Sequence, residues 1–334
     1  MPILSTEQEN SLRAFINLFI ESPITKMIMA DFDRLRYNKR LGGEQQCMLL
    51  TGDTGSGKTH LIKEYRQRSL EKNNRYITPV LVSRIPSKPR LDSTIIQLLK
   101  DLGHFGSTYR KGKSSDQTLT ESLIRCLRNQ NTELIIINEF QELVEFKSGK
   151  ALNEIANRLK YISEEAEIPI VLVGMPWITK ITSEPQWASR LIIQRELGYF
   201  KLSEDSEHFS RFVKGILLRS PIPPSSKLLS KVVILSLFKV SKGQLRRLKH
   251  FIDESVKIAM FESQTELTSD TFSAVFTLWH PEDTNPFKQK AEEILGQEVQ
   301  SYSRYDSGAD NEFDAIIPTQ FTDKLTLSQL LKKK

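Results

Sequence analysis

The segment that most constrains this chain is a glycine-rich stretch between two apolar runs. It matches the pattern G-x-x-x-x-G-K-[ST], with Gly52, Gly57, Lys58 and Thr59 at the fixed positions. Glycines let the backbone turn so that successive N–H groups point inward and can bind an anion. The preceding run predicts a strand and the following one a helix, whose N-terminus adds a positive dipole end. The stretch therefore predicts a phosphate-binding loop.

Each part of this loop has an expected role in holding a nucleoside triphosphate. Lys58 is expected to reach the β- and γ-phosphates, and the Thr59 hydroxyl is expected to bind Mg²⁺. ATP and Mg²⁺ are therefore the expected cofactors. The residues expected to contact them are those of the loop and the first helical turn: Gly52, Asp53, Thr54, Gly55, Ser56, Gly57, Lys58, Thr59 and His60.

A second element, ELIIINEFQEL at residues 133–143, carries acidic and amide side chains. Apolar residues followed by polar ones predict a buried strand whose carboxyl end reaches the phosphate site. P-loop ATPases usually have Asp followed by Glu here, whereas this chain has Asn138 followed by Glu139. Glu139 keeps the expected general-base role. Asn138 can accept a hydrogen bond from a metal-bound water but adds no negative charge, so weaker Mg²⁺ binding and slow hydrolysis are expected.

Strand and helix patterns alternate through the first two thirds of the chain. Such alternation predicts an α/β fold, a mostly parallel five-stranded αβα sandwich, over residues 41–202. The expected strands are residues 47–51, 76–84, 134–138, 169–174 and 196–201. The expected helices are residues 58–72, 91–102, 117–128 and 150–165.

Three other segments flank this predicted domain. Residues 1–40 form an amphipathic helical segment that fits either a packing or a docking role. Residues 203–280 carry helical patterns at 209–218, 226–238, 244–261 and 269–278, which predict a small lid domain. Residues 281–334 contain an acidic stretch with few apolar residues, so a mobile tail is expected, ending in LSQLLKKK, which could form a docking helix.

Composition excludes some settings for the chain. No apolar run approaches the roughly 20 residues that span a bilayer, and the N-terminus lacks a signal-peptide pattern. Two cysteines form no disulfide framework, so a reducing, cytoplasmic location is expected. The histidines and cysteines do not cluster at metal-ligand spacing. The net charge of +6 is compatible with a nucleic-acid partner but decides little alone.

Residues 84–113 are more basic than the rest of the predicted α/β domain, with seven bases and two acids. This excess favours sequence-independent, salt-dependent binding of double-stranded DNA, although a solvated basic face is the alternative. No helix-turn-helix, zinc finger or basic zipper is recognisable. The candidate DNA contacts are there and in a second loop: Lys88, Arg90, Arg110, Lys111, Lys113, Lys147 and Lys150.

The order of these motifs resembles the AAA+ superfamily. PQWASRL at residues 185–191 resembles its arginine-finger segment and offers Arg190, with Arg195 as second choice. SKGQLRRLKHFI at residues 241–252 resembles the sensor 2 helix and offers Arg246. The resemblance implies that Arg190 acts on the γ-phosphate of a neighbouring subunit. The expected catalytic set is then Glu139, Lys58, Arg190 and Arg246.

A narrower resemblance covers about residues 46–200. LVSRIPSKPRLDSTIIQLLKDLG, IIINEFQEL and ALNEIANRLKYISEEAEIPIVLVGMP are similar to the TnsC/TniB family of transposition regulators in bacterial mobile elements. This resemblance implies an ATP-dependent, DNA-binding homo-oligomer, a ring or filament. It also implies two protein partners, transposase subunits and a target-selector protein of the TniQ type.

Other functions stay open at this point. A replication initiator or helicase loader shares the fold, although the short acidic region after Leu278 disfavours a winged helix. A P-loop small-molecule kinase needs no DNA and no oligomer, and the basic stretch and separate lid argue against it. Asn138 also makes a nucleotide-locked scaffold, which binds ATP and hardly hydrolyses it, a serious variant.

Overall fold

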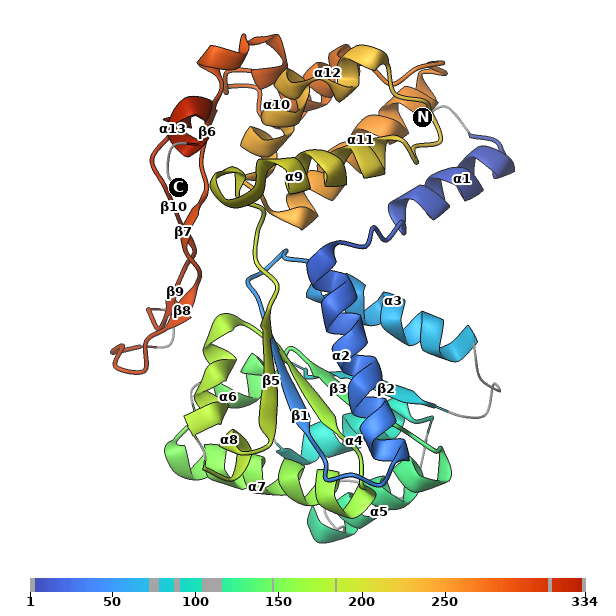
Figure 1. The fold of residues 1–334 in the computed structure, drawn as a ribbon, viewed down its shortest axis with the longest axis vertical. Helices are drawn as coiled ribbons and strands as arrows, with labels where there is room; N and C mark the ends of the chain where they lie inside the picture. Colours follow the sequence, from blue (N-terminus) through green and yellow to red (C-terminus); the bar gives the residue numbers. More distant parts are fainter. Residues whose placement is uncertain are drawn as a thin grey trace.

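A parallel sheet of five strands lies at the centre of the lower part of the molecule (Figure 1). The computed structural model describes residues 4–71, 78–86, 91–103, 116–145, 147–183, 185–311 and 314–331. The strand order is β2-β3-β4-β1-β5, and each neighbouring pair is parallel. The strands are β1 (Cys47–Thr51), β2 (Val80–Arg84), β3 (Leu134–Asn138), β4 (Ile170–Gly174) and β5 (Leu191–Glu196).

Helices cover both faces of this sheet, which confirms the predicted α/β fold. Side chains alternate between the faces of a strand, so Cys47 and Leu49 lie in one apolar cluster and Met48 and Leu50 in another. The first cluster includes α4, α5 and α7, and the second includes α2 and α3. The helices of this part are α2 (Pro23–Arg40), α3 (Lys58–Glu71), α4 (Leu91–Asp101), α5 (Asp116–Asn129), α6 (Gln141–Val144), α7 (Gly149–Ala166), η1 (Pro176–Ser183) and α8 (Pro185–Ala188).

The fifth strand begins earlier than its predicted position at residues 196–201. The structure places β5 at Leu191–Glu196, where it pairs with β1 and forms an edge of the sheet. Leu191 and Ile193 are buried while Ile192 is 62% exposed, as expected of an edge strand covered on one face. The alternation of buried and exposed side chains marks residues 191–196 as the strand. The predicted stretch instead leads from the sheet to the upper part of the molecule.

The helices of residues 202–279 form most of that upper part, the lid (Figure 1). Their apolar faces build a core that includes Phe209, Phe238 and Phe251. Ser230 and Thr268 accept hydrogen bonds from backbone N–H groups at the starts of two of the helices, which fixes where those helices begin. The lid elements are α9 (Leu202–Leu217), η2 (Ser226–Leu229), α10 (Lys231–Ser241), α11 (Leu245–Phe261) and α12 (Ser269–Trp279).

The N-terminal segment packs against both parts of the molecule. It forms α1 (Thr6–Ile16) and α2, and a capping box at Ser22 starts the second helix. Leu12 and Phe15 of α1 are buried in the lid core, whereas Phe32 of α2 is buried against the sheet. The segment therefore packs within its own chain, and a docking role for it stays a prediction.

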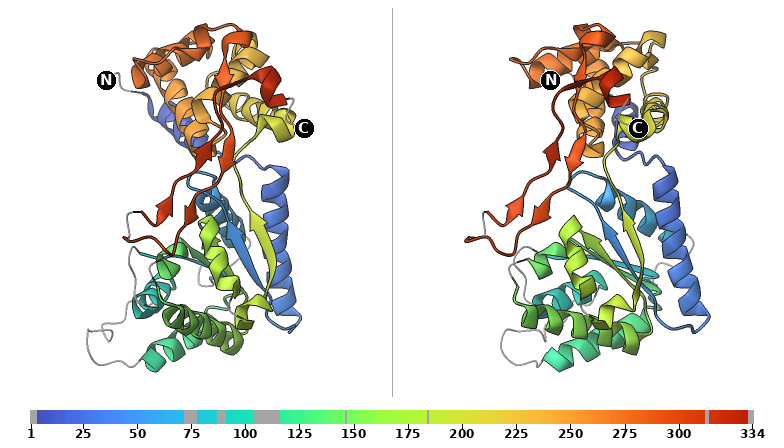
Figure 2. Two further views of the ribbon diagram at one scale, coloured as in Figure 1. Left: turned by 90° about the vertical axis from the view of Figure 1, so that its left-hand side faces the viewer. Right: turned by 60° about the vertical axis from the view of Figure 1, so that its left-hand side comes forward.

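The segment after Pro281 has regular structure, which differs from the mobile tail that its composition suggests. Three short antiparallel strand pairs form it: β7 with β10, β6 with β11, and β8 with β9. In Figure 2 this segment runs from the lid down beside the sheet domain. Its few apolar residues are well placed, since Ile294, Val299 and Leu330 are buried. The elements are η3 (Pro286–Lys288), η4 (Ala291–Glu293), β6 (Leu295–Gly296), β7 (Val299–Ser301), β8 (Arg304–Tyr305), β9 (Ile316–Ile317), β10 (Gln320–Phe321), β11 (Leu325–Thr326) and α13 (Leu327–Leu331).

Three observations concern the setting of the chain. Both cysteines, Cys47 and Cys126, are buried and unpaired. Of the helices in the described ranges, none is both long and apolar enough to cross a bilayer. The same ranges contain no group of three or more His, Cys, Asp or Glu side chains able to hold a metal ion.

Candidate nucleotide site

The glycine-rich loop lies between β1 and α3, at the carboxyl end of the central strands. Gly57 has φ +105°, a conformation that side chains with a Cβ rarely adopt. A Cβ there would also lie 2.7 Å from Leu245 of the lid. A Cβ on Gly52 would lie 2.5 Å from the carbonyl oxygen of Leu197. These two positions therefore need glycine because the loop turns tightly beneath the lid.

The ammonium group of Lys58 is held inside the loop. Its Nζ donates to the carbonyl oxygen of Gly52 at 2.5 Å and to that of Asp53 at 3.0 Å. Burial lowers the pKa of Lys58 to about 8, although the negative charges of Glu139 and Asp53 act to raise it. A phosphate bound in this loop would supply a further negative charge and favour the protonated amine.

The end of β3 meets the start of α3, as predicted. Asn138 Nδ2 donates to Thr59 Oγ1 at 3.4 Å. Asn138 Oδ1 is buried and has no hydrogen-bond partner among the described residues. Ser56 Oγ, in the loop, is likewise buried and has no hydrogen-bond partner among the described residues. Buried polar atoms without partners are uncommon in folded proteins, so these two atoms indicate a place for a polar ligand.

Glu139 follows directly and has an unusual backbone conformation. Its φ is +59°, in the left-handed region that residues other than glycine seldom occupy. Its carboxylate accepts a hydrogen bond from Gln141 Nε2 at 2.7 Å. Gln141 is itself fixed, because its Oε1 accepts from the backbone N–H of Met175. The acidic group is thus held beside the loop by a residue that the sequence analysis did not single out.

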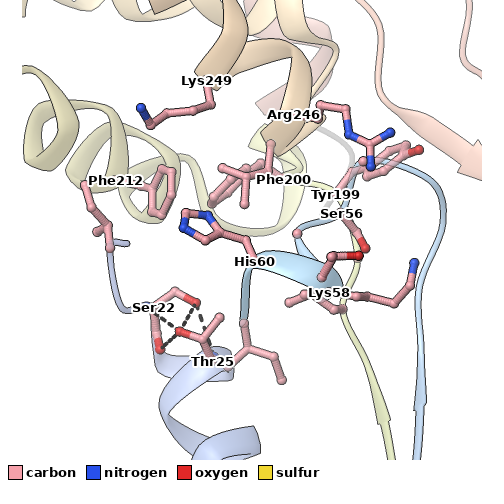
Figure 3. A pocket seen from close by; sticks show the side chains of 18 of the residues that line it. Ser22, Thr25, Ser56, Lys58, His60, Tyr199, Phe200, Phe212, Arg246 and Lys249 are labelled. Atoms are coloured by element: carbon pink, nitrogen blue, oxygen red, sulfur yellow. Dashed lines mark hydrogen bonds between the residues drawn. The ribbon is translucent and has the colours of Figure 1, made fainter. Parts of the chain in front are cut away.

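A cavity of about 1160 Å³ lies between the loop, the lid and the connection from α1 to α2. That volume is ample for a nucleotide-sized ligand. Figure 3 shows His60 below Phe200 and Phe212, with Lys249 reaching in from the lid. Burial lowers the pKa of His60, which favours its neutral form. The cavity thus has apolar walls on one side and the phosphate-binding loop on the other.

Arg246 lies where the sensor 2 resemblance implies. Its backbone N–H donates to the carbonyl oxygen of Gly55 at 3.0 Å. In Figure 3 its side chain extends from the lid toward Ser56 and Tyr199, above Lys58. The structure therefore brings a lid arginine to the loop of the same chain, while its catalytic role stays a prediction.

Arg190 lies away from the loop of its own chain. Its carbonyl oxygen accepts from the N–H of Cys47, the first residue of β1, whereas the loop follows the last residue of that strand. Its guanidinium forms an ion pair with Glu164. The second choice, Arg195, forms an ion pair with Asp31 at 2.7 Å. A role for Arg190 is therefore conceivable only toward another subunit, and stays a prediction.

The candidate DNA contacts are only partly described. Lys147 and Lys150, at the start of α7, are both exposed. The other candidates lie outside the described residues: Lys88, Arg90, Arg110, Lys111 and Lys113.

The sequence analysis also missed contacts from the C-terminal segment. Asp53 accepts hydrogen bonds from the Ser303 N–H and the Thr319 hydroxyl, which are 250 and 266 residues away along the chain. No periodicity or motif spacing signals a pairing over such a distance.

These features define a P-loop protein with the AAA+ ATPase fold. Solved structures with this fold are similar over most of the chain. The Aeropyrum pernix ORC2 protein in ADPNP–ADP complexes has a TM-score of 0.59 and 18% identity, and the match covers 79% of this chain and 71% of that chain. CDC6P from Pyrobaculum aerophilum has a TM-score of 0.58 and 11% identity, and the match covers 79% of this chain and 70% of that chain. At such identity the likeness shows the fold alone.

The family is shown by a separate comparison. The family model described as bacterial TniB protein matches residues 16–214, more than half of the 334 residues. The chain therefore belongs to the TniB family. No curated protein sequence matches it significantly.

Proposed function

We propose that this protein is an ATP-dependent, DNA-binding AAA+ regulator of transposition. It forms a homo-oligomer on double-stranded DNA and links a TniQ-type target selector to the transposase. The observation that carries this proposal is the convergence of Lys58, Asn138, Glu139 and Arg246 around one loop in a chain of the TniB family.

The loop residues would bind the triphosphate of ATP. Backbone N–H groups and the N-terminus of α3 offer positive partial charge, and Lys58 adds a full charge. Thr59 would hold Mg²⁺ through its hydroxyl. Asn138 would act through its unpaired Oδ1, which would accept a hydrogen bond from a metal-bound water. Mg²⁺, when bound, neutralises negative charge on the phosphate oxygens. The neutral amide of Asn138 makes this site weaker than one with an aspartate.

Glu139 would orient the attacking water and accept its proton. Its carboxylate is bonded to Gln141 in this structure, so it must turn from that partner to reach a water beside the γ-phosphate. The combination of a held Glu139 and a neutral Asn138 supports slow ATP hydrolysis. Slow turnover suits a protein whose assembly on DNA is timed by its nucleotide.

Arg190 would complete the site of a neighbouring subunit. Its distance from the loop of its own chain supports a role between subunits, where a guanidinium stabilises charge on the γ-phosphate. Exposed Lys147 and Lys150, with the basic residues of the 84–113 stretch, would contact DNA phosphates. ATP would then favour assembly on DNA, and hydrolysis would favour release.

The test is electron microscopy of the purified protein with duplex DNA. Rings or filaments are expected with a non-hydrolysable ATP analogue and few or none with ADP or without nucleotide. Lys58→Ala should abolish assembly, while Arg66→Ala, which removes a charge from an exposed position of the same helix, should leave it intact. Assembly by the Lys58→Ala protein equal to that of the wild type would disprove the proposal.

The second candidate is a replication initiator or helicase loader, since ORC2 and CDC6P share the fold and the fold alone does not separate the two functions. Binding assays with purified partners separate the two functions. Capture of transposase and target selector supports the first, and capture of a replicative helicase supports the second.

A further inference from the structure

The C-terminal segment is bonded to the phosphate-binding loop through Asp53. This aspartate is 3% exposed, although it belongs to a loop that binds anions. Its Oδ2 accepts from the N–H of Ser303 at 2.9 Å and from the hydroxyl of Thr319. Its Oδ1 accepts from the N–H of Thr54 at 2.7 Å. One carboxylate oxygen is therefore turned to the loop and the other is turned to the C-terminal segment.

A pair of tyrosines makes a second link beside the first. The hydroxyl of Tyr302 accepts from the N–H of Tyr199 at 2.8 Å, and the hydroxyl of Tyr199 donates to the carbonyl oxygen of Thr54 at 2.6 Å. Gln244 of the lid donates to that same Tyr199 hydroxyl at 3.1 Å. Tyr199 thus connects the C-terminal segment, the loop and the lid at one point.

The segment is fixed on both sides of these contacts. Toward the lid, the buried carboxylate of Glu298 accepts from the N–H of Ser203 at 2.8 Å and from its hydroxyl at 2.6 Å. Toward the sheet domain, the ring of Tyr305 lies under Lys180 Nζ at 4.0 Å. Residues 298–311 and 314–321, which include these two anchors and both partners of Asp53, we call the ribbon. Figure 2 shows this segment running from the lid down beside the sheet domain.

The charge of Asp53 bears directly on Lys58. Lys58 Nζ donates to the backbone carbonyl oxygen of Asp53 at 3.0 Å, so the two residues are in direct contact. A carboxylate released from Ser303 and Thr319 would be free to pair with the ammonium group that ATP needs. It would also repel the triphosphate. Holding Asp53 against the ribbon keeps Lys58 available to phosphate.

We propose that the ribbon is a working part of the nucleotide site. Ser303 and Thr319 hold Asp53 as a positioning residue, so that a docked ribbon strengthens ATP binding and bound ATP strengthens ribbon docking. The reciprocity follows because two binding events that favour the same conformation must assist each other equally. This inference rests on the proposed binding of ATP in the loop.

The test compares variants of the full chain by calorimetric titration with Mg·ATP. Thr319→Val removes the hydroxyl with little change of shape and is expected to weaken ATP binding about fivefold or more. Thr319→Ser keeps the hydroxyl and is expected to restore binding. Ser301→Ala is the matched control, because that hydroxyl bonds to Gln320 within the ribbon. Tyr302→Phe, which weakens the second link, should also reduce ATP affinity.

Limited proteolysis of the full chain supplies a readout that a purely structural role would not move. Mg·ATP is expected to slow cleavage within the ribbon of the wild type, and to slow it less in Thr319→Val. The inference is overturned if Thr319→Val binds ATP as tightly as the wild type does, or more tightly. The thermal midpoint of unfolding, which should be the same in both proteins, confirms that the variant is folded.

Lys58→Ala separates this failure from failure of the proposed function. If Lys58→Ala loses ATP binding while Thr319→Val keeps it, the loop binds ATP and only the role of the ribbon is refuted. If Lys58→Ala binds ATP as well as the wild type does, the proposed function itself fails. Should Thr319→Val not fold, the Tyr302→Phe result decides by the same criteria.

Discussion

The side-chain amide of Asn138 lies at the point of the site where Mg²⁺ is expected to bind. Its Oδ1 is buried without a partner among the described residues, and its Nδ2 faces Thr59 at 3.4 Å. An aspartate in its place would carry a negative charge, which the Thr59 hydroxyl and a bound Mg²⁺ could stabilise. The residue is thus positioned for metal binding and lacks the charge that makes such binding strong.

Asn138→Asp is therefore expected to lower the Mg²⁺ concentration needed for ATP hydrolysis about fivefold, and to raise the rate at low Mg²⁺. A hydrogen bond to a charged group is worth about 1 kcal/mol more than one to a neutral group, which sets this magnitude. ATPase assays over a Mg²⁺ titration measure it, with exposed Asn153→Asp as control. An unchanged Mg²⁺ requirement would contradict the role given to Asn138.

The lowered pKa of Lys58 predicts a pH dependence of ATP binding. Because that pKa is about 8 in the folded chain, the amine loses its proton as pH rises through that value. ATP binds the protonated form, so affinity should fall above pH 8, by up to about tenfold per pH unit. Calorimetry from pH 7 to pH 9.5 measures the effect. Lys58→Arg keeps its charge and should give a flatter profile; an equally flat wild-type profile would refute the assignment.

At the scale of elements, the ribbon depends on its attachment to α9. Glu298 is 3% exposed and accepts two hydrogen bonds from Ser203. Glu298→Gln replaces one acceptor by an NH₂ group that faces a donor. The free energy of unfolding is expected to fall by about 1–3 kcal/mol, the cost of a buried polar group left unsatisfied. Urea denaturation measures this loss, and exposed Glu292→Gln should cost much less; equal losses would argue against the attachment.

The elements differ in how far the sequence predicts them. The continuous apolar runs of β1 and β3 predict buried parallel strands, and the structure confirms both at the predicted residues. β5 lies before its predicted position. Its side chains are alternately buried and exposed, a pattern typical of a strand at the edge of a sheet. The structure of the ribbon could not be predicted from its sequence, because few of its residues are apolar. It is ordered instead by antiparallel strand pairing and by contacts with residues far away in the sequence, such as Asp53.

The site follows the same division. Local motifs place Lys58 and Thr59 beside Asn138, because parallel strands bring their carboxyl ends to one edge of the sheet. Arg246 was reached through a resemblance, and the structure puts its backbone against the loop. The hydrogen bond from Gln141 to the Glu139 carboxylate could not be predicted from the sequence, because it depends on the left-handed backbone conformation of Glu139.

At the scale of the whole molecule, DNA binding makes a prediction about salt. Lys147, which precedes α7, and Lys150, in the first turn of α7, are both exposed. If each neutralises one phosphate, changing both to alanine should lower the slope of log K against log salt by about 1.8. Fluorescence anisotropy with a random duplex at several salt concentrations measures the slope. The paired control is Lys227→Ala with Lys231→Ala on the lid, and an unchanged slope in the α7 variant would remove these lysines from the DNA interface.

The packing of the last fifty residues affects how the protein should be handled at the bench. A fragment trimmed at Pro281, as the acidic composition invites, would strip Phe287 from its stack on Phe251 and Leu330 from the lid core. It would also leave the Asp53 carboxylate without its two distant donors. Such a minimal core would retain every recognisable motif, yet its affinity for ATP would not represent that of the intact chain.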